Sequence, residues 1–206
     1  MKYRGYAVLD IETTGLDYRD NEMTQFAVVH LDRDGNFEGS FDRFVKIDRE
    51  EVPEKIVELT GITKKDTDTG VSKRKAKRML KKLLKNRILV IQNAAFDLSY
   101  IETITGKGYN FLDIQCFSLH QHPDLKANLK AQADRFGFEF EHHKATDDAM
   151  VTAKIFNEYS KVFDTDEFIN YLIVRKSRPM RRVPLNTEKI DIMVAGEFSS
   201  ILRTGE

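Results

Sequence analysis

The sequence predicts an α/β fold on the strength of three observations. Three short apolar segments separated by turn residues open the chain, and a continuous apolar run lies near its middle. Segments with apolar residues at helical spacing follow each of these regions. With 206 residues, of which 41% are hydrophobic, the chain suits one ordinary domain with a sizeable core and a terminal extension.

Composition bounds the class of protein but not its partners. Lys plus Arg and Asp plus Glu both number 33, so the net charge favours neither a basic nor an acidic ligand. A single cysteine, Cys116, excludes an intrachain disulfide framework and fits a reducing compartment. It lies in an apolar segment and is interpreted as a core residue. No apolar run approaches the length of a membrane span, so we expect a cytoplasmic protein without membrane association.

An antiparallel meander of three strands is predicted at the N-terminus. The first strand is an apolar run that begins near Tyr6 and has two acidic residues at its end. Residues 25–31 form the second strand, and residues 32–36 have the Asp, Gly and Asn residues of a hairpin turn. The third strand is expected over residues 40–47.

Helices and buried strands follow the meander. Pro53 opens a helix that stops at Gly61, because proline suits the first turn and glycine the left-handed end of a helix. Residues 71–87 form a second helix, and residues 88–91 (ILVI) suit a central buried strand. Another helix begins near Ala94.

The second half of the chain repeats this alternation. A strand over residues 111–114 leads into a helix, and a further helical stretch beginning near Pro123 ends at Gly137. Residues 142–146 form a polar loop before a helix over residues 147–163, whose apolar residues recur with the 3.6-residue period.

The C-terminal residues, from about 164, hold two apolar stretches, residues 168–174 and 190–195. A basic segment with proline, residues 175–184, separates them. We favour an edge strand and a helix that complete the domain over a segment that docks onto another protein.

The helix over residues 71–87 carries basic residues without a single acid. Its apolar residues share one side, and lysines and arginines occupy the rest. Such a surface suits phosphate groups or the acidic patch of a partner protein. A solvated helix face is an equally good interpretation, because exposed lysine-rich faces are ordinary.

The first strand ends in two acidic residues, Asp10 and Glu12, with one isoleucine between them. Side chains two positions apart on a strand point to the same face, so the two carboxylates lie side by side. Burying them together is unfavourable unless a cation lies between them, and Mg²⁺ or Mn²⁺ prefers oxygen ligands. A solvated edge strand is the alternative. The Thr-Thr-Gly that follows favours a site, because loops at strand ends carry chemistry.

Further candidate residues lie at Asp97, near the start of a helix, and at Asp148, with His143 five positions before it. With their neighbours they form three motifs: Val8 to Leu16 (VLDIETTGL), Asn93 to Asp97 (NAAFD) and His143 to Ala149 (HKATDDA). In these motifs the sequence resembles the DEDDh class of 3′-to-5′ exonucleases, which includes the proofreading epsilon subunit of bacterial replicative polymerases. The supporting matches are Glu58 to Ile62 (ELTGI), Asp113, Pro123 and Gly137, so the resemblance covers roughly residues 6–160.

Two departures from the family pattern concern the second and third motifs. The family usually has a histidine where this chain has Gln92, and since glutamine also donates and accepts hydrogen bonds we expect altered positioning with catalysis retained. The third motif allows two registers, because His142 and Asp147 have the same spacing as His143 and Asp148. The two following alanines fit the family only in the second register, which selects His143 and Asp148.

The resemblance implies a ribonuclease H-like fold with a mixed five-stranded sheet flanked by helices. It implies an exonuclease domain over residues 1–163, and leaves residues 164–206 as an extension of uncertain role. It also implies a two-metal mechanism in which Asp10, Glu12, Asp97 and Asp148 hold two divalent cations, Mg²⁺ or Mn²⁺. Asp10 would bridge both ions, and Asp97 would hold the second largely through water. His143 would take a proton from the attacking water.

The same resemblance implies a set of residues that contact the terminal nucleotide. Thr13 and Thr14 would approach it, and Leu16 would wedge against its base. The others would line the same site: Thr60, Gly61, Asn93 and Phe96. A site that grips the backbone and stacks bases implies single-stranded ends with little sequence preference.

The leading hypothesis for function is a metal-dependent 3′-to-5′ exonuclease on single-stranded DNA ends, of proofreading or repair type, with a DNA polymerase subunit as a possible partner. A second hypothesis is a 3′-to-5′ exoribonuclease, because recognition of the 2′-OH depends on local shape that the motifs do not specify. A third is a polymerase-anchoring or nucleic-acid-binding module. The presence of all four acids and the histidine argues against an inactive site.

Overall fold

The computed structural model describes residues 3–175, 182–194 and 197–203, whose strands form two sheets. The larger sheet has the order β3-β2-β1-β4-β5 and the smaller one the order β6-β7-β8. Five strands make up the larger sheet: β1 (Tyr6–Thr13), β2 (Met23–Leu31), β3 (Phe37–Phe44), β4 (Ile88–Ile91) and β5 (Phe111–Asp113). Since β1 pairs antiparallel with β2 and parallel with β4, the sheet is mixed, as predicted.

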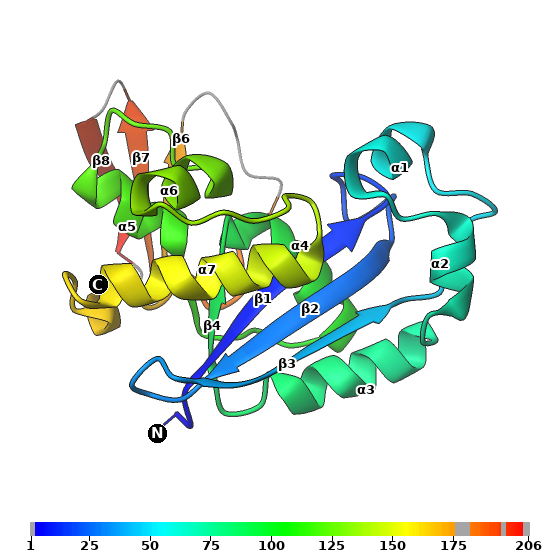
Figure 1. Ribbon diagram of the computed structural model, residues 1–206. Coiled ribbons are helices and arrows are strands. Elements are labelled where there is room, and N and C mark those ends of the chain that lie inside the picture. The colour runs from blue at the N-terminus through cyan, green and yellow to red at the C-terminus, as the bar shows by residue number, and fades with distance from the viewer. Residues whose placement is uncertain (1–2, 176–181, 195–196, 204–206) are drawn as a thin grey trace.

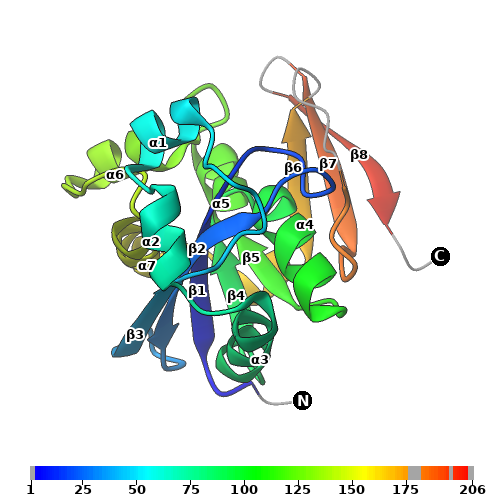
Figure 2. The ribbon, with the colours of Figure 1, turned by 90° about the vertical axis from the view of Figure 1, so that its right-hand side faces the viewer.

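Helices cover both faces of this sheet. Figures 1 and 2 show α7 (Ala145–Ser160) against one face, with α3 (Lys73–Leu83) and α4 (Ala94–Thr105) on the other side. Both α5 (Ile114–Gln121) and α6 (Leu129–Phe136) contribute to the core beneath α7. Alternate residues of β1 enter the two cores, Val8 under α7 and Leu9 under α3 and α4.

The register of β1 places its C-terminal half beyond the end of β4. Leu9 pairs with Ile91, the last residue of β4, so Asp10 to Thr13 extend past that strand while still pairing with β2. Asp10 and Glu12 continue the alternation that directs Val8 toward α7. The acidic end of β1 therefore lies where α4 begins and under the start of α7.

The N-terminal meander follows the prediction, with one shift. The turn over residues 32–36 joins β2 to β3, but β3 begins at Phe37 and ends at Phe44, earlier than the expected 40–47. Phe37 already pairs with Leu31 directly after the turn, so the hairpin starts pairing at once. Val45 instead bridges Val71.

Between β3 and β4 the structure contains three helices, of which two were predicted. In α1 (Glu54–Thr60), Pro53 is the N-cap and Gly61 the left-handed C-cap with φ 72°. The unpredicted helix is α2 (Lys64–Thr69), which lacks apolar periodicity but starts with a capping box between Thr63 and Asp66. That Thr-x-x-Asp pattern is the signal that could have identified it.

The basic helix α3 is shorter than the predicted 71–87. It begins after Ser72, whose side chain caps it, and ends at Leu83. Arg87 is buried and does not belong to a basic surface, because it donates to the carbonyls of Tyr6 and Leu31 and pairs with Glu38. The basic face therefore consists of exposed residues between Lys73 and Lys85.

The later helices are also displaced from their predicted bounds. Asn128 caps α6, so the residues from Pro123 onward form a loop before it. Helix α7 begins at Ala145, earlier than the predicted residue 147, and ends at Ser160. No helix in the described part of the chain is both long and apolar enough to cross a membrane.

The extension folds differently from the expected edge strand and helix. After the 3-10 turn η1 (Thr165–Phe168), the two predicted apolar stretches are strands β6 (Tyr171–Arg175) and β7 (Lys189–Val194), and β8 (Glu197–Arg203) completes a second sheet. Phe168 packs on Phe117 of α5 with ring centroids 4.4 Å apart. Much of the predicted basic segment lies outside the described residues. The division of the chain at residue 163 stays a prediction.

Candidate active site

Three carboxylates from two elements converge at the end of β1. The side chains of Asp10 and Glu12 come from β1 and that of Asp148 from the first turn of α7. One oxygen from each lies within 4.8 Å of the others. The strand period brings the first pair together, and α7 packs across β1 so that Asp148 meets them (Figure 1).

Asp97 lies beside this group, in the first turn of α4, and its side chain is buried. Its position depends on Asp113, whose carboxylate accepts hydrogen bonds from the backbone amides of Asn93 (3.1 Å) and Ala94 (2.9 Å). Asp113 thereby fixes the turn into α4, where Asn93 adopts a left-handed φ of 66°. Asp113 was one of the supporting matches of the family resemblance, but the sequence did not predict this role for it.

Burial and neighbouring negative charges raise the pKa values of these acids. Burial, followed by the negative charges of Asp97 and Asp148, raises the pKa of Asp10 well above its ordinary value. Burial raises the pKa of Glu12 to about 8, with Asp148 adding to the effect. Burial also raises the pKa of Asp97, although backbone amides act in the opposite direction.

No lysine or arginine among the described residues forms an ion pair with Asp10, Glu12 or Asp97. Buried carboxylates in proteins are normally paired with cationic groups or bound to metals. An all-oxygen donor set with several negative charges fits a hard divalent cation. The residues present therefore suit the metal ions that the sequence resemblance implies.

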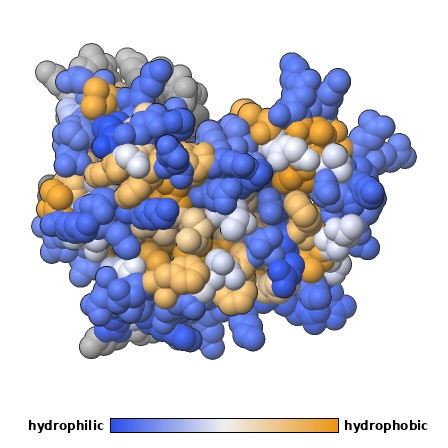
Figure 3. All heavy atoms as spheres, viewed as in Figure 1, coloured by the Kyte–Doolittle hydropathy of each residue, from blue (hydrophilic) through white to orange (hydrophobic). Residues whose placement is uncertain are grey.

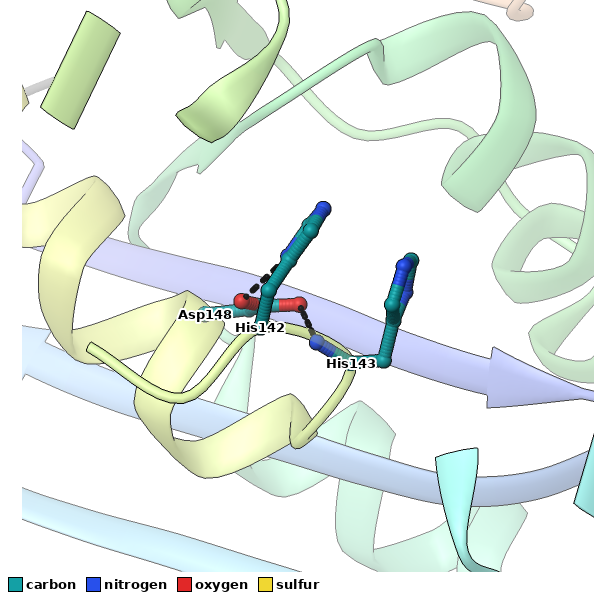
Figure 4. Close-up of side chains that lie close together, drawn as sticks. All are labelled: His142, His143 and Asp148. Carbon is teal, nitrogen blue, oxygen red and sulfur yellow. Dashed lines mark hydrogen bonds and ion pairs between the residues drawn. The ribbon is translucent and has the colours of Figure 1, made fainter. Parts of the chain in front are cut away.

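Two histidines contact Asp148 in different ways (Figure 4). Nδ1 of His142 lies 3.0 Å from Oδ1 of Asp148. His143 uses its backbone amide, which donates to Oδ2 of Asp148 at 3.1 Å, and its φ of 67° turns the chain there. The two rings stack with centroids 3.9 Å apart. Sequence reasoning selected His143 alone and missed the contact from His142, although the adjacent histidine was a visible signal.

The loop after β1 holds the first group of predicted substrate-binding residues. Thr13 donates its hydroxyl to the Gly15 carbonyl at 2.7 Å, and the Thr14 hydroxyl accepts from the Glu22 amide at 3.0 Å. The side chain of Leu16, by contrast, is 68% exposed. The threonine hydroxyls therefore shape the loop, while Leu16 is free to meet a ligand.

The second group lies on two other elements. Thr60 and Gly61 end α1, which lies beyond the C-terminal end of β1 in Figure 1. Figure 3 shows apolar side chains at the surface over α1, where Leu59 is 50% exposed. Asn93 is exposed before α4, and Phe96 is half-buried, with its ring 5.5 Å from that of Tyr100.

Tyr100 links these two groups and was not predicted. Its hydroxyl donates to the carbonyl of Gly15 at 2.6 Å, so α4 braces the loop that carries Leu16. Nothing in the sequence pattern distinguishes this buried tyrosine from a core aromatic residue.

Gln92 points toward α6. Its side-chain amide donates to the Ala127 carbonyl at 2.9 Å, and its oxygen accepts from Gln132 at 2.8 Å. Gln132 in turn accepts from the hydroxyl of Tyr159 at 3.0 Å. The residue that replaces the family's usual histidine thus supports the packing between α6 and α7.

The basic face of α3 lies on the opposite side of the sheet from Asp10, Glu12 and Asp148, since α3 packs in the core that contains Leu9. At its N-terminal end, Lys73 pairs with Glu22 and Asp48. The remaining basic residues of α3 have no ion pair within the described segments. This placement separates the basic face from the reacting groups.

The family model for RNase T-type exonucleases matches residues 7–156. This chain belongs to that exonuclease family. Over 157 residues it is 33% identical to the PolC-type DNA polymerase III of Clostridium perfringens, and over 171 residues 31% identical to that of Staphylococcus aureus. These matches cover 73% and 76% of this chain but 11% of each polymerase. This chain therefore spans about a tenth of the length of the curated relatives that it matches.

Solved exonuclease structures share the fold. Exonuclease I has a TM-score of 0.68 at 18% identity, covering 79% of this chain and 42% of its own. Exonuclease X in complex with 5′ overhanging duplex DNA has a TM-score of 0.66 at 16% identity, covering 79% and 96%. The nuclease domain of 3′hExo, a DEDDh family member bound to rAMP, has a TM-score of 0.65 at 16% identity, covering 77% and 92%. The predicted DEDDh resemblance and ribonuclease H-like fold are confirmed.

Proposed function

We propose that this chain is a metal-dependent 3′-to-5′ exonuclease that releases nucleoside monophosphates from single-stranded DNA ends. One observation carries the proposal: Asp10, Glu12 and Asp148 converge within 4.8 Å, with the buried Asp97 beside them. Such a group is unfavourable in a folded protein unless cations neutralise it. Membership of the exonuclease family gives the group its chemistry.

The carboxylates are the proposed ligands of two divalent cations, Mg²⁺ or Mn²⁺. Asp10, Glu12 and Asp148 would hold one ion, and Asp97 would hold the second together with Asp10. When bound, the two cations stabilise the negative charge on the attacking and leaving oxygens of a phosphodiester displacement. Asp113 acts indirectly, because its hydrogen bonds keep the start of α4, and therefore Asp97, in place.

His143 is the proposed general base. Burial, followed by the neighbouring His142, lowers its pKa, which favours a neutral imidazole near pH 7. A ring nitrogen of the neutral form accepts the proton of the attacking water. The bond from the His143 amide to Asp148 keeps the base next to the acids while its side chain stays partly exposed.

The terminal nucleotide is proposed to lie between the loop after β1 and the end of α1. Leu16 is exposed there and would stack against a base, while Thr13 and Thr14 set the shape of its loop. Thr60, Gly61, Asn93 and Phe96 would line the other side. Apolar contacts that stack on any base favour single strands with little sequence preference.

The relatives support DNA as the substrate, because they are DNA polymerases that contain a segment similar to this chain. A DNA polymerase is accordingly the proposed protein partner. RNA ends are the second candidate, since one structural neighbour, 3′hExo, is bound to rAMP. Recognition of the 2′-OH depends on contacts with the terminal sugar, and it separates the two substrates.

The test uses purified protein with DNA and RNA oligonucleotides labelled at either end, in Mg²⁺, Mn²⁺ or EDTA. The proposal predicts that a 5′-labelled DNA strand shortens progressively from its 3′ end, and that EDTA stops the reaction. A 3′-labelled strand should release labelled mononucleotide from the start. Shortening from the 5′ end, or full activity in EDTA, contradicts the proposal. Faster cleavage of RNA selects the second candidate.

A further inference from the structure

Asp148 belongs to two groups of potential metal ligands. One is the carboxylate group with Asp10 and Glu12, and the other combines Asp148 with His142 and His143. One ligand atom from each residue of the second group lies within 4.8 Å of the other two, and His142 Nδ1 is 3.0 Å from Asp148 Oδ1. Figure 4 shows both imidazoles rising from the loop next to the carboxylate of Asp148.

The donor atoms of the two groups favour different cations. The acidic group offers only oxygen, which suits Mg²⁺ and Mn²⁺. Two imidazole nitrogens and one carboxylate oxygen instead suit Zn²⁺, Co²⁺ or Ni²⁺. Ligand atoms around a tetrahedral zinc ion are about 3.4 Å apart, given zinc–ligand bonds of about 2.0–2.1 Å. The atoms His142 Nδ1 and Asp148 Oδ1 lie 3.0 Å apart, and no separation in the histidine group exceeds 4.8 Å, so small side-chain shifts reach that geometry.

Both histidines are accessible from solvent. His142 is exposed, His143 is half-buried, and their rings lie together at a centroid distance of 3.9 Å. The Asp148 carboxylate is held from one side by the His143 amide, which leaves Oδ1 directed at His142. An ion could therefore enter from solvent and meet a carboxylate that is already oriented.

We propose that His142, His143 and Asp148 form an inhibitory site for a borderline transition-metal ion such as Zn²⁺. Occupation engages the imidazole of the proposed base His143 and draws Asp148 away from Asp10 and Glu12. Mg²⁺ does not compete effectively for the two nitrogen ligands. The inhibitory half of this proposal rests on the proposed nuclease activity, whereas the binding half does not.

Binding is tested with tag-free protein by titrating Co²⁺ in the presence of a millimolar excess of Mg²⁺, followed by visible absorption and calorimetry. A single equivalent should bind and give the intense absorption bands of a site with nitrogen ligands. His142→Ala and His143→Ala should each weaken binding by at least about tenfold, because even the loss of a residue that only orients a metal ligand costs that much. His122→Ala is the matched control and should bind as the parent does. Unchanged affinity in His142→Ala, or complete displacement of Co²⁺ by Mg²⁺, overturns the site.

Inhibition is tested by titrating Zn²⁺ into the Mg²⁺-supported cleavage assay, with each variant compared with its own zinc-free rate. The proposal predicts that micromolar Zn²⁺ inhibits the parent and His122→Ala, and that His142→Ala needs at least about tenfold more. Tight Co²⁺ binding without zinc inhibition overturns the inhibitory role. A protein that never cleaves nucleic acid but binds Co²⁺ through the histidines contradicts the proposed function, and leaves the metal site standing on the binding data alone.

Discussion

Two buried carboxylate groups in this protein are stabilised in opposite ways. At the end of β1, burial and then nearby negative charges raise the pKa values of Asp10, Glu12 and Asp97, and no cationic side chain of the described residues pairs with them. At the junction with the extension, the buried Asp191 accepts a hydrogen bond from the Tyr171 hydroxyl at 2.6 Å and pairs with Lys189 at 3.3 Å. The first group needs an ion from outside the chain, whereas the second is balanced by the chain itself.

The second group also joins the extension to helix α5. Nε2 of His120, on α5, lies 3.0 Å from the Tyr171 hydroxyl, and the Lys189 ammonium lies 4.2 Å from the centroid of the Tyr171 ring. A buried charge with internal partners stabilises a particular packing, while a buried charge without them indicates a ligand. The comparison explains why two similarly buried aspartates have different expected roles.

The largest expected effect comes from removing charge at the first group. Asp10→Asn should lower cleavage by at least about 10³-fold, the upper range for losing one group that stabilises transition-state charge. The metal-free variant should nevertheless melt at the same temperature as the parent or higher, because repulsion among the acids is relieved. Cleavage assays with calorimetry on the same samples check both parts.

The matched control for the acids is Asp147→Ala, one residue before Asp148 in the same helical turn and outside both groups of potential ligands. It should cleave at close to the parental rate. Activity retained in Asp10→Asn, or lost in Asp147→Ala, would remove the distinction between the two carboxylate groups.

The next effect concerns the two histidines. His143→Ala should reduce the cleavage rate by on the order of 10²-fold, the usual scale for losing a general base. His142→Ala should cause a smaller loss, because its ring bonds to Asp148 and the amide of residue 143 still holds that carboxylate. Rates at saturating substrate across pH provide the measurement. The larger loss in His142→Ala would assign the base to His142.

The sequence predicted the acid group better than its surroundings. Strand alternation places Asp10 and Glu12 on one face, and their motif led to Asp97 and Asp148. The alternation of Asp10 and Glu12 is local geometry, whereas Asp97 on α4 and Asp148 on α7 reach the group through long-range packing that only the family resemblance implied. The contact from His142 depends on the left-handed backbone at His143, a conformation that sequence spacing does not reveal.

Elements that depend on long-range contacts were predicted less well. Gln92 was expected near the site, yet its side chain bonds to Ala127, in the loop before α6, and to Gln132 of α6, which lie 35 and 40 positions later. Strand β8 was not predicted, because it belongs to a second sheet that forms only through pairing with β7. The polar helix α2 was missed because it buries only Thr67, so apolar periodicity gave no signal.

A third prediction tests the balanced group. Tyr171→Phe removes the hydroxyl that donates to Asp191 and should destabilise the protein by about 1.5–3 kcal/mol, the range for hydrogen bonds to charged groups. In a domain of this size that corresponds to a fall in melting temperature of roughly 3–12 °C. Tyr109→Phe is a suitable control. It removes the hydroxyl of another buried tyrosine, which lies in the main domain and does not contact Asp191. A Tyr171→Phe variant as stable as the parent would show that the extension does not depend on this bond.

The smallest expected effect is a pH dependence that separates the two groups. Since the pKa of Glu12 is about 8 in the folded protein and near 4.5 ordinarily, the folded state binds this proton more tightly than the unfolded state does. The stability that this proton contributes is fully present below about pH 4.5 and is lost as the pH rises toward 8. In EDTA, therefore, the melting temperature should fall between pH 5 and pH 8. Saturating Mg²⁺ should reduce that fall, because the ion binds the charged carboxylates and stabilises the folded state that holds it. Glu12→Gln should flatten the profile in EDTA, whereas Tyr171→Phe should shift the whole profile downward without changing its slope. Equal slopes for the parent and Glu12→Gln would mean that the acids at the end of β1 are solvated and balanced like ordinary surface carboxylates.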